Sequence, residues 1–391
     1  MKLQCPVCAS SRVDLFFEMN SIPVFCNVLH ASREEALTTT RGDMRLGFCN
    51  ECGHLFNYAF DPVLMEYTQT YENSLHFSPR FQKFAEQLAQ ELATRYDLHG
   101  KDIIEMGCGK GDFLKMICDL GENRGVGFDA SFQPELVTNS NHERFKVIQD
   151  FYSSKYSHYH AHFIACRHVL EHIDTPNKFV GDVRMAVGDK HDAIIYFEVP
   201  NALWTLRDLG VWDLIYEHCS YYTANSLARV FAEGGFDVLR LQEQFGGQFL
   251  GIELALRNNK QIDNHAFDIS MTELASLVKR FGENYKSKVE MWQGTFDKLH
   301  DEEKRIVTWG GGSKGVTFLN VMREFSNIEY MVDINPRKHG MFVAGAGQKV
   351  IGPDFLASYK PDAVIVMNPI YIDEIRAMLG SHGLQPELLV A

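Results

Sequence analysis

Apolar positions recur along this chain with two different spacings. In one long stretch, Phe77, Phe81, Phe84, Leu88 and Leu92 repeat every three or four positions, which predicts a long amphipathic helix. Further along, short apolar runs of strand length alternate with helical windows, a pattern typical of a mostly parallel sheet covered on both faces. The predicted strands of this α/β core are Asp102 to Met106, Gly125 to Phe128, Lys146 to Ile148, His162 to Ala165, Ala193 to Glu198 and Val238 to Gln242.

The same alternation returns towards the C-terminal end. A polar interval around Asn258 to Asn264 is followed by helical spacing from Met271 to His300, which predicts a connecting helix. Three further buried strands are expected over Arg305 to Trp309, Ile328 to Val332 and Ala363 to Met367. They predict a second, smaller parallel sheet flanked by helices.

The first 60 residues lack such a repeat. Their apolar patches, Val13 to Phe17 and Arg45 to Phe48, are short and lie between turns, so this segment has too little apolar material for an independent core. Another interaction must hold it together. The expected organisation is an N-terminal module over residues 1–60, an α/β core with a helical lead-in over 61–256, a connecting helix over 257–302 and a smaller Rossmann-like domain over 303–391.

Length and composition narrow the class of protein. A chain of 391 residues has room for several domains, and 45% hydrophobic, 12% aromatic and 23% charged residues are ordinary for a globular enzyme. The net charge of −13 repels nucleic acid, so a small molecule is the expected partner. No apolar run has the length of a signal peptide or a membrane span, so the expected location is cytoplasmic, with no membrane partner. The oligomeric state is left open.

Four of the nine cysteines form two C-x-x-C pairs, Cys5 with Cys8 and Cys49 with Cys52. Four thiolates on two turns match a tetrahedral zinc site, and a structural zinc ion would stabilise the short N-terminal segment. Four sulfur ligands leave no open position for a substrate. The alternative is two unconnected turns with reduced thiols. His30 or His54 could replace one cysteine, but both are expected to be polar surface residues.

A glycine-rich turn follows the first predicted strand of the core. Glu105 ends that strand, and Gly107, Gly109 and Gly111 occupy alternate positions before a helix that begins near Asp112. Glycines let the backbone approach a ligand closely, and the helix N-terminus offers unpaired N–H groups to an anionic group. The E-x-G-x-G-x-G pattern resembles class I S-adenosylmethionine-dependent methyltransferases more than dinucleotide-binding enzymes, whose fingerprint is G-x-G-x-x-G.

Acidic residues after the next two strands indicate an adenosine ligand. Asp129 ends the second core strand, where a carboxylate can accept both ribose hydroxyls. Asp150, followed by Phe151, could accept from an adenine amine beside an aromatic face. The alternative is a fortuitous glycine turn with surface aspartates. The residues expected to bind S-adenosylmethionine are Glu105, Gly107, Cys108, Gly109, Gly111, Asp129, Asp150, Phe151, Arg167 and His168.

The fourth and fifth core strands lead into further polar clusters. His168, Glu171 and His172 would share one face of a helix, and H-x-x-E-H is also a signature of some zinc proteases. At the carboxyl end of a strand in an α/β sheet, a ligand-binding role is favoured instead. Glu217 beside His218 suits proton abstraction near neutral pH, although each cluster could simply cap or pack. The expected substrate contacts here are Glu198, Asn201, Tyr221 and Tyr222.

The last domain carries a second glycine motif. Gly310, Gly312 and Gly315 form G-x-G-x-x-G after a predicted strand, and Asp333 ends the next strand. A domain of about ninety residues is half a dinucleotide fold, so a complete NAD site is not expected. The motif either contacts a phosphate or nucleotide, with Lys314 as a substrate contact, or serves packing alone.

In this order the parts resemble the sugar C-methyltransferase family, typified by the 3-C-methyltransferase of tetronitrose biosynthesis. The resemblance covers almost the whole chain and rests on Cys5, Cys8, Cys49, Cys52, Glu105 to Gly111, the VLEHI run, Glu217-His218, Ser220 and Tyr221. It implies a thymidine-diphosphate keto sugar as substrate and active-site positions for His172, Glu217 and His218. The chain departs from the family's pattern at Ile215, where a tyrosine is usual, and Tyr216 lies next to Glu217 instead.

The expected function is methyl transfer from S-adenosylmethionine to a carbon beside a ketone of a nucleotide-linked deoxysugar, as in surface-polysaccharide pathways. His218, held by Glu217, would remove the proton beside the carbonyl, and His172 would stabilise the enolate oxygen or share the proton. Tyr216 completes the expected catalytic set. Two alternatives remain open at this point: a sugar O-methyltransferase on the same scaffold, and a non-catalytic nucleotide-sugar binding protein.

Overall fold

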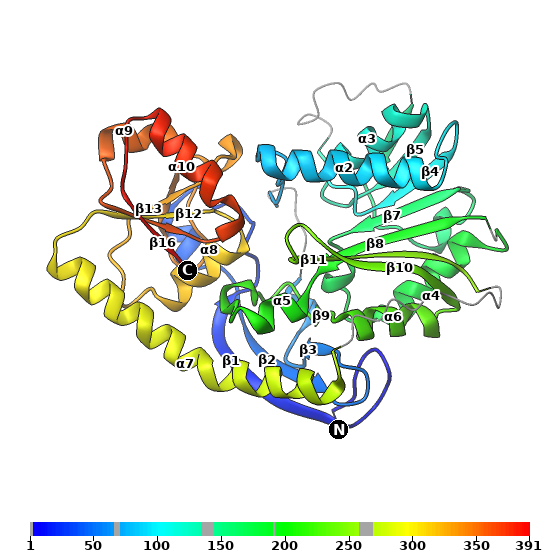
Figure 1. The fold of residues 1–391 in the computed structure, drawn as a ribbon, viewed down its shortest axis with the longest axis horizontal. Coiled ribbons are helices and arrows are strands. Elements are labelled where there is room, and N and C mark those ends of the chain that lie inside the picture. Colours follow the sequence, from blue (N-terminus) through cyan, green and yellow to red (C-terminus); the bar gives the residue numbers. More distant parts are fainter. Residues whose placement is uncertain (1–2, 66–70, 134–143, 191, 258–268) are drawn as a thin grey trace.

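The computed structural model describes residues 3–65, 71–133, 144–190, 192–257 and 269–391. The predicted polar interval around Asn258 to Asn264 lies outside these residues. The strands within them form sheets of four, seven and five strands. Figure 1 shows the seven-stranded sheet on the right, the five-stranded sheet on the left and the four-stranded sheet below them.

The seven-stranded sheet contains every strand predicted for the core and one more. Its strands are β4 (Asp102–Met106), β5 (Arg124–Phe128), β6 (Phe145–Ile148), β7 (Phe163–Arg167), β8 (Ile194–Pro200), β10 (Phe236–Gln244) and β11 (Phe249–Leu256). The order is β10-β11-β8-β7-β4-β5-β6, with β11 antiparallel to both neighbours. The mostly parallel sheet is therefore confirmed. The sequence did not reveal β11, since it is buried along nearly its whole length and shows no alternation.

Helices cover both faces of this sheet, as expected. They are α2 (Pro79–Arg95), α3 (Asp112–Gly121), α4 (Pro176–Val187) and α6 (Ala224–Glu233). In Figure 1, α2 and α3 lie above the sheet and α4 and α6 below it, and each pair contributes to its own apolar cluster. Ser78 caps α2 by accepting from Phe81 N, so the helix begins one residue after the cap and Phe77 precedes it.

The N-terminal segment is more regular than its sequence suggests. The four-stranded sheet contains β1 (Val13–Pro23), β2 (Arg41–Cys49), β3 (Leu55–Asn57) and β9 (Ser220–Tyr221), and α1 (Arg33–Leu37) connects β1 to β2. The expectation of short, broken segments was wrong because apolar side chains such as Phe17 and Met19 pack against other parts of the chain. The last strand of the sheet, β9, comes from the core.

The C-terminal sheet is parallel throughout, as predicted. Its strands are β12 (Ile306–Trp309), β13 (Tyr330–Val332), β14 (Lys349–Ile351), β15 (Ala363–Val366) and β16 (Glu387–Val390), in the order β14-β13-β12-β15-β16. The short strands β14 and β16 were not predicted. The remaining helices are α5 (Ala202–Arg207), α7 (Met271–Asp301), α8 (Ser313–Val321), α9 (Leu356–Tyr359) and α10 (Ile372–Ser381). Short 3₁₀ turns lie at Pro62–Leu64, Ser154–Tyr156, Leu170–His172, Val211–Asp213, Pro336–Lys338, Pro353–Phe355 and Pro369–Tyr371.

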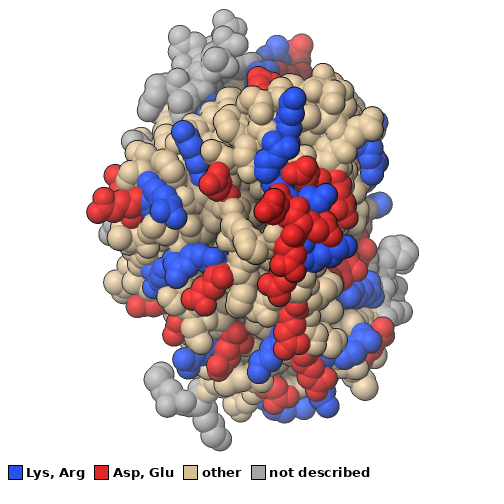
Figure 2. Space-filling model, turned by 90° about the vertical axis from the view of Figure 1, so that its left-hand side faces the viewer, with Lys and Arg blue, Asp and Glu red and all other residues tan. Residues whose placement is uncertain are grey.

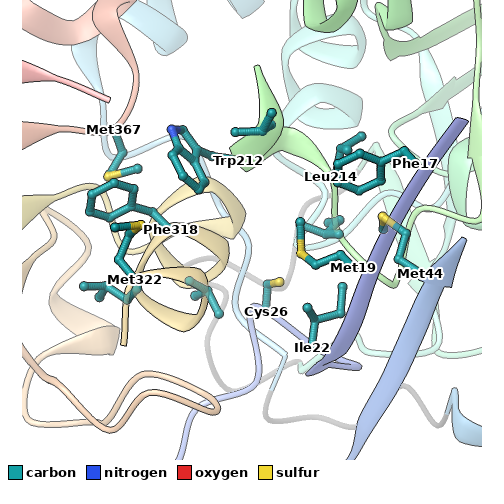
Figure 3. Close-up of a cluster of buried hydrophobic side chains, with 14 of the residues drawn as sticks. Phe17, Met19, Ile22, Cys26, Met44, Trp212, Leu214, Phe318, Met322 and Met367 are labelled. Carbon is teal, nitrogen blue, oxygen red and sulfur yellow. The ribbon is translucent and has the colours of Figure 1, made fainter. Parts of the chain in front are cut away.

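One apolar cluster joins the N-terminal sheet, the segment after α5, and helices α7 and α8. Trp212 packs edge-on against Phe318 of α8, with ring centroids 4.9 Å apart, and Phe17 of β1 lies 5.7 Å from Phe281 of α7. Figure 3 shows Trp212 and Phe318 at one end of this cluster and Phe17 at the other. Because the cluster is continuous, it connects the N-terminal sheet to the C-terminal sheet.

The surface carries mixed charge. Figure 2 shows the face of the molecule that contains the C-terminal sheet and its helices, where acidic side chains gather along the middle with basic ones among them. The visible described residues on that face form no continuous basic patch. Among the described helices, none combines the length and apolar composition needed to cross a bilayer.

Candidate active site

A cavity opens at the carboxyl ends of β4, β5 and β7. Its volume is about 710 Å³, a size suited to a small-molecule ligand. The chain passes from β4 to β5 on one side and returns to β7 on the other, and such a reversal opens a crevice where doubly wound sheets bind ligands. We call it the core cavity. All residues expected to bind S-adenosylmethionine line it except Gly111.

The glycine turn gives this cavity a wall made of backbone. Gly107, Gly109 and Gly111 have φ of 69°, 54° and 81°, the left-handed region that glycine adopts most easily. A Cβ at Gly107 would lie 2.1 Å from a methyl group of Val169, so no side chain fits there. Gly111 is the N-cap of α3, which places the start of that helix behind the turn.

Asp129 fastens the glycine turn to the end of β5. Gly109 N donates to Asp129 Oδ2 over 2.8 Å, while Ser131 donates to Oδ1 from its backbone N (2.8 Å) and its hydroxyl (2.6 Å). These bonds leave acceptor capacity on Oδ2. A ribose hydroxyl could therefore still bind there, although the carboxylate is less free than the sequence suggests.

Asp150 and Phe151 lie at the rim of the core cavity. Tyr156 Oη donates to Asp150 Oδ2 over 2.6 Å, and Lys155 forms an ion pair with the same oxygen. Phe151 is 64% exposed, so its ring is open to a planar ligand. The adenine-binding role of this pair stays a prediction.

Glu105 is a buried carboxyl group in the wall of the core cavity. Burial raises its pKa to about 8, and its Oε2 has no hydrogen-bond partner among the described residues. An unpartnered acidic oxygen beside a backbone cradle suits a cationic ligand with N–H donors. S-adenosylmethionine has both properties, so these residues fit it.

Glu198 supports the cavity wall from behind and was wrongly expected to contact substrate. It is fully buried and lines neither cavity. Arg167 donates to its Oε1 from Nε (3.0 Å) and Nη2 (2.8 Å), and His168 Nε2 lies 3.0 Å from the same oxygen. Burial opposes protonation of His168, but Glu171 and Glu198 outweigh it and raise its pKa to about 9. Glu198 thus holds two cations at the core cavity.

The second cavity, of about 330 Å³, lies between the core and the C-terminal sheet, and we call it the interdomain cavity. Gly310, Gly312, Lys314, Asp333 and Tyr221 line it. Lys314 Nζ lies 2.6 Å from Asp213 Oδ1 and 4.4 Å from the ring centroid of Trp204. Gly315 faces inward, because a Cβ there would lie 2.1 Å from Gly310 O, and so it serves packing.

The two cavities adjoin. The residues that line both are Tyr71, Asn73, Ser74, Leu75, His168 and His172. They belong to the segment before α2 and to the turn after β7, which together form the partition between the cavities.

His172 and His218 meet at this partition, with ring centroids 4.9 Å apart. Loss of solvent, followed by the influence of His172, lowers the pKa of His218 to about 3, so its imidazole is neutral. His172 Nδ1 lies 3.0 Å from the backbone O of Glu217. The expectation that His168, Glu171 and His172 share a helical face was wrong: His168 has φ of 55°, and only one 3₁₀ turn follows it.

Glu217 is fully buried and lines neither cavity. Its Oε1 accepts from Cys26 N and its Oε2 from Tyr71 Oη, each over 2.7 Å. Both carboxylate oxygens are therefore engaged, and neither holds His218 as expected. Glu217 instead holds Tyr71 at the partition.

Three further expected site residues lie outside both cavities. Tyr216, expected to be catalytic, is buried and accepts from Asp61 N over 2.8 Å. Asn201 is the N-cap of α5, a structural role. Tyr222 is fully buried with its ring centroid 4.8 Å from that of His54, which is itself buried and not a surface residue.

Sequence reasoning missed the segment before α2. Tyr71 lines both cavities, and the adjacent Glu72 is only 4% exposed. Glu72 accepts from Asn335 Nδ2 (3.1 Å) and Arg337 Nη1 (3.3 Å) and forms an ion pair with Lys110 of the glycine turn. No motif marks this residue, since Lys110 and Arg337 lie 38 and 265 positions away in the chain.

The four paired cysteines come together in the N-terminal module. Sγ of Cys5 lies 3.7 Å from Sγ of Cys52, and Sγ of Cys8 lies 3.5 Å from Sγ of Cys49. All four sulfurs lie within 4.8 Å of one another. Zn–S bonds of about 2.3 Å in a tetrahedron place sulfurs about 3.8 Å apart, so this donor set fits a structural zinc ion.

Comparison with protein families identifies two domains. Residues 77–241 match the family model described as a methyltransferase domain, and residues 264–383 match that of a C-methyltransferase C-terminal domain. A comparison with curated protein sequences gives no match.

Among solved structures, the chain resembles N,N-8-amino-8-demethyl-D-riboflavin dimethyltransferase from Streptomyces davawensis, with 19% identity and a TM-score of 0.36 over 45% of this chain and 56% of that one. It also resembles magnesium protoporphyrin IX methyltransferase from Synechocystis PCC 6803, solved with bound SAH, with 12% identity and a TM-score of 0.36 over 46% and 84%. The match thus spans little more than half the length of the first protein.

The chain therefore contains a methyltransferase domain over residues 77–241, with the class I Rossmann-like α/β fold. More particularly, it combines this catalytic domain with the C-terminal domain of C-methyltransferases, here built on a parallel five-stranded sheet.

Proposed function

We propose that the protein methylates a carbon beside a ketone of a nucleotide-linked deoxysugar. The observation that carries this proposal is the meeting of two cavities at His172 and His218. The core cavity fits the methyl donor, and the interdomain cavity fits the acceptor. A donor and an acceptor bound in adjoining cavities would react at the partition, where the histidines lie.

The methyl donor would be held by the glycine turn, Glu105 and Asp129. When bound, S-adenosylmethionine supplies an electrophilic methyl group on a sulfonium. Glu105 offers an unpartnered oxygen, and Asp129 retains acceptor capacity beside the turn. Arg167 and His168, fixed by Glu198, keep their positive charge on the same wall.

The acceptor's diphosphate would bind at the carboxyl end of β12. The Gly310 to Gly312 turn precedes α8, whose N-terminus faces an anion favourably. Lys314 and Lys338 add two cations to the lining, and Lys338 is held by Gly311 O over 2.9 Å. Aromatic Trp204 lies in the same lining and offers a face to the base or sugar.

Proton removal is the step that this chain's own residues would perform. A carbon beside a carbonyl becomes nucleophilic only after it loses a proton to a base. His218 lines the interdomain cavity with a neutral imidazole, which can accept that proton at a ring nitrogen. His172, 4.9 Å away, could share the proton or donate to the enolate oxygen.

We also propose that the four cysteines bind one structural zinc ion. The spacing of their sulfurs supports this, and Cys5, Cys49 and Cys52 are buried against the core. A zinc ion there would fix the turn before β1 to the turn between β2 and β3. Elemental analysis of the purified protein should find about one zinc per chain.

The proposal is tested with thymidine-diphosphate-linked keto sugars in deuterated water. The wild type should exchange the hydrogen beside the ketone and, with S-adenosylmethionine, form a product whose NMR spectrum shows a C–CH₃ group. His218→Ala should lose exchange while binding S-adenosylmethionine normally in calorimetry. An O–CH₃ product, or exchange at an unchanged rate in the variant, would refute the proposal.

A further inference from the structure

A second buried carboxylate, that of Glu171, lies beside the histidine pair. Glu171 is only 1% exposed, and it lines the interdomain cavity. One of its oxygens and a ring nitrogen each of His172 and His218 all lie within 4.8 Å of one another. Its Oε2 has no hydrogen-bond partner among the described residues, which is rare for a buried carboxylate. This oxygen can therefore still accept a hydrogen bond.

The other carboxylates near the pair are already engaged. Glu217 accepts from Cys26 N and Tyr71 Oη with its two carboxylate oxygens, and its backbone O lies 3.0 Å from His172 Nδ1. Glu198 holds Arg167 and His168. Of the three buried carboxylates around this site, only Glu171 keeps an oxygen free.

Glu171 is also held in place for such a role. His168 Nδ1 lies 3.6 Å from its Oε1, so a cation fixes one oxygen and favours the ionised carboxylate. Glu171 lies inside the single 3₁₀ turn Leu170–His172, so it is the immediate neighbour of His172 in the chain. The turn therefore presents a carboxylate to the two histidines.

We propose that Glu171, rather than Glu217, is the positioning carboxylate of the histidine pair. It orients His172 and His218 through their ring N–H groups and balances the positive charge that the pair acquires on taking the acceptor's proton. This inference rests on the proposed function in one respect: the proton that the pair takes is the one beside the ketone of the acceptor. The reason is physical: a buried imidazolium needs a nearby negative charge, and a carboxylate also selects which ring nitrogen carries the hydrogen.

The first test needs no substrate, so it can fail independently of the proposed function. Protein with ¹⁵N-labelled histidine is compared by NMR at neutral pH in three forms: wild type, Glu171→Gln and Glu217→Gln. His172→Gln and His218→Gln assign the ring signals. Glu171→Gln should change the ring nitrogen shifts of the pair, which report the tautomer, whereas Glu217→Gln should leave them in place. Unchanged signals in Glu171→Gln, or a change in Glu217→Gln alone, overturn the inference.

The second test is kinetic. Glu171→Gln should lower kcat and the rate of solvent exchange by roughly 10²-fold with little change in KM, because the base is displaced and not the substrate. Glu171→Asp should recover part of the rate, and it keeps the test valid if the amide variant folds poorly. Calorimetric binding of S-adenosylmethionine serves as the folding control.

The same three side chains could instead bind a divalent cation, and one measurement decides between the two roles. Mn²⁺ is titrated into wild type and Glu171→Gln and followed by electron paramagnetic resonance. Absence of tight Mn²⁺ binding supports the positioning role. Tight binding that Glu171→Gln abolishes would make Glu171 a metal ligand and overturn the inference.

Discussion

The contacts of Glu72 make a sharp prediction about how the domains are held together. Glu72 precedes α2, accepts from Asn335 and Arg337 of the C-terminal domain, and pairs with Lys110 in the glycine turn. Glu72→Gln keeps the size of the side chain but removes its charge. The variant leaves the cations of Lys110 and Arg337 facing a neutral amide in a largely buried site.

The loss can be estimated from the burial of the partners. Removing one member of a buried ion pair costs about 3–5 kcal/mol, and hydrogen bonds to charged groups contribute about 1.5–3 kcal/mol each. The side chain of Glu72 is 5% exposed, but those of Lys110 and Arg337 are 18% and 30% exposed, so solvent screens part of the effect. The lower end, about 3 kcal/mol, is therefore expected.

Urea unfolding gives the free energy, and Glu374→Gln is the matched control. Glu374 Oε2 accepts from Ser78 Oγ over 2.9 Å, so it joins the same segment to the same domain without a buried ion pair. Its loss should be about 1 kcal/mol. Equal losses in the two variants would refute the reasoning.

The pH dependence provides a second check on the same variant. Burial opposes ionisation of Glu72, but Lys110 and then Arg337 outweigh it and hold its pKa below the ordinary value. A carboxylate whose pKa is depressed by folding stabilises the protein above its unfolded pKa of about 4.3, and the effect is lost as pH falls through the folded value. The stability difference between wild type and Glu72→Gln should therefore be full at pH 7 and shrink below about pH 4. A difference that stays constant with pH would contradict the electrostatic explanation.

Three further predictions concern the two cavities and the module. Burial raises the pKa of Glu105 to about 8, and a cationic ligand stabilises its carboxylate, so binding of S-adenosylmethionine at pH 7 should release a proton from Glu105. Calorimetry in buffers of different ionisation enthalpy measures this proton release, and Glu105→Gln should abolish the release. Lys314→Met should weaken binding of thymidine diphosphate tenfold or more in calorimetry without affecting S-adenosylmethionine, since Lys314 lines only the interdomain cavity. Cys49→Ser should reduce zinc content and methyl transfer together, and full activity in a zinc-free variant would count against the module's role.

The sequence predicted well those features that depend on neighbouring residues. The strands of the core are short apolar runs separated by helical windows, and the turn from Glu105 to Gly111 needs glycines for reasons of local backbone geometry. Both could be recognised without knowing what packs against them. The pairing of Cys5 and Cys8 with Cys49 and Cys52 was also readable, because thiols at C-x-x-C spacing have few other uses in a short segment.

The errors concern which way a side chain faces at the end of a strand. Glu198 lies near the end of β8 and Asp129 directly follows β5, yet Glu198 is buried behind the cavity wall and Asp129 lines the cavity. A side chain near the end of a strand can point into the cavity or away from it. Glu198 points towards Arg167 of the neighbouring strand, a contact that the local sequence does not reveal. The roles of Tyr71 and Glu72 could not be predicted from the sequence, because their partners come from distant parts of the chain.

The pairing of β3 with β9 connects the four-cysteine module to the segment that contains His218. β9 is only two residues long and begins two residues after His218, and a pairing this short is not stable alone. It is held because Asn57 N donates to Cys219 O over 2.9 Å, and Thr223 Oγ1 donates to Gly53 O over 3.2 Å. The N-terminal module thus hydrogen-bonds to Cys219 and Thr223, which follow His218, the candidate base. In the proposed mechanism the module's contribution is positional, since the four cysteines line neither cavity and β9 begins two residues after His218.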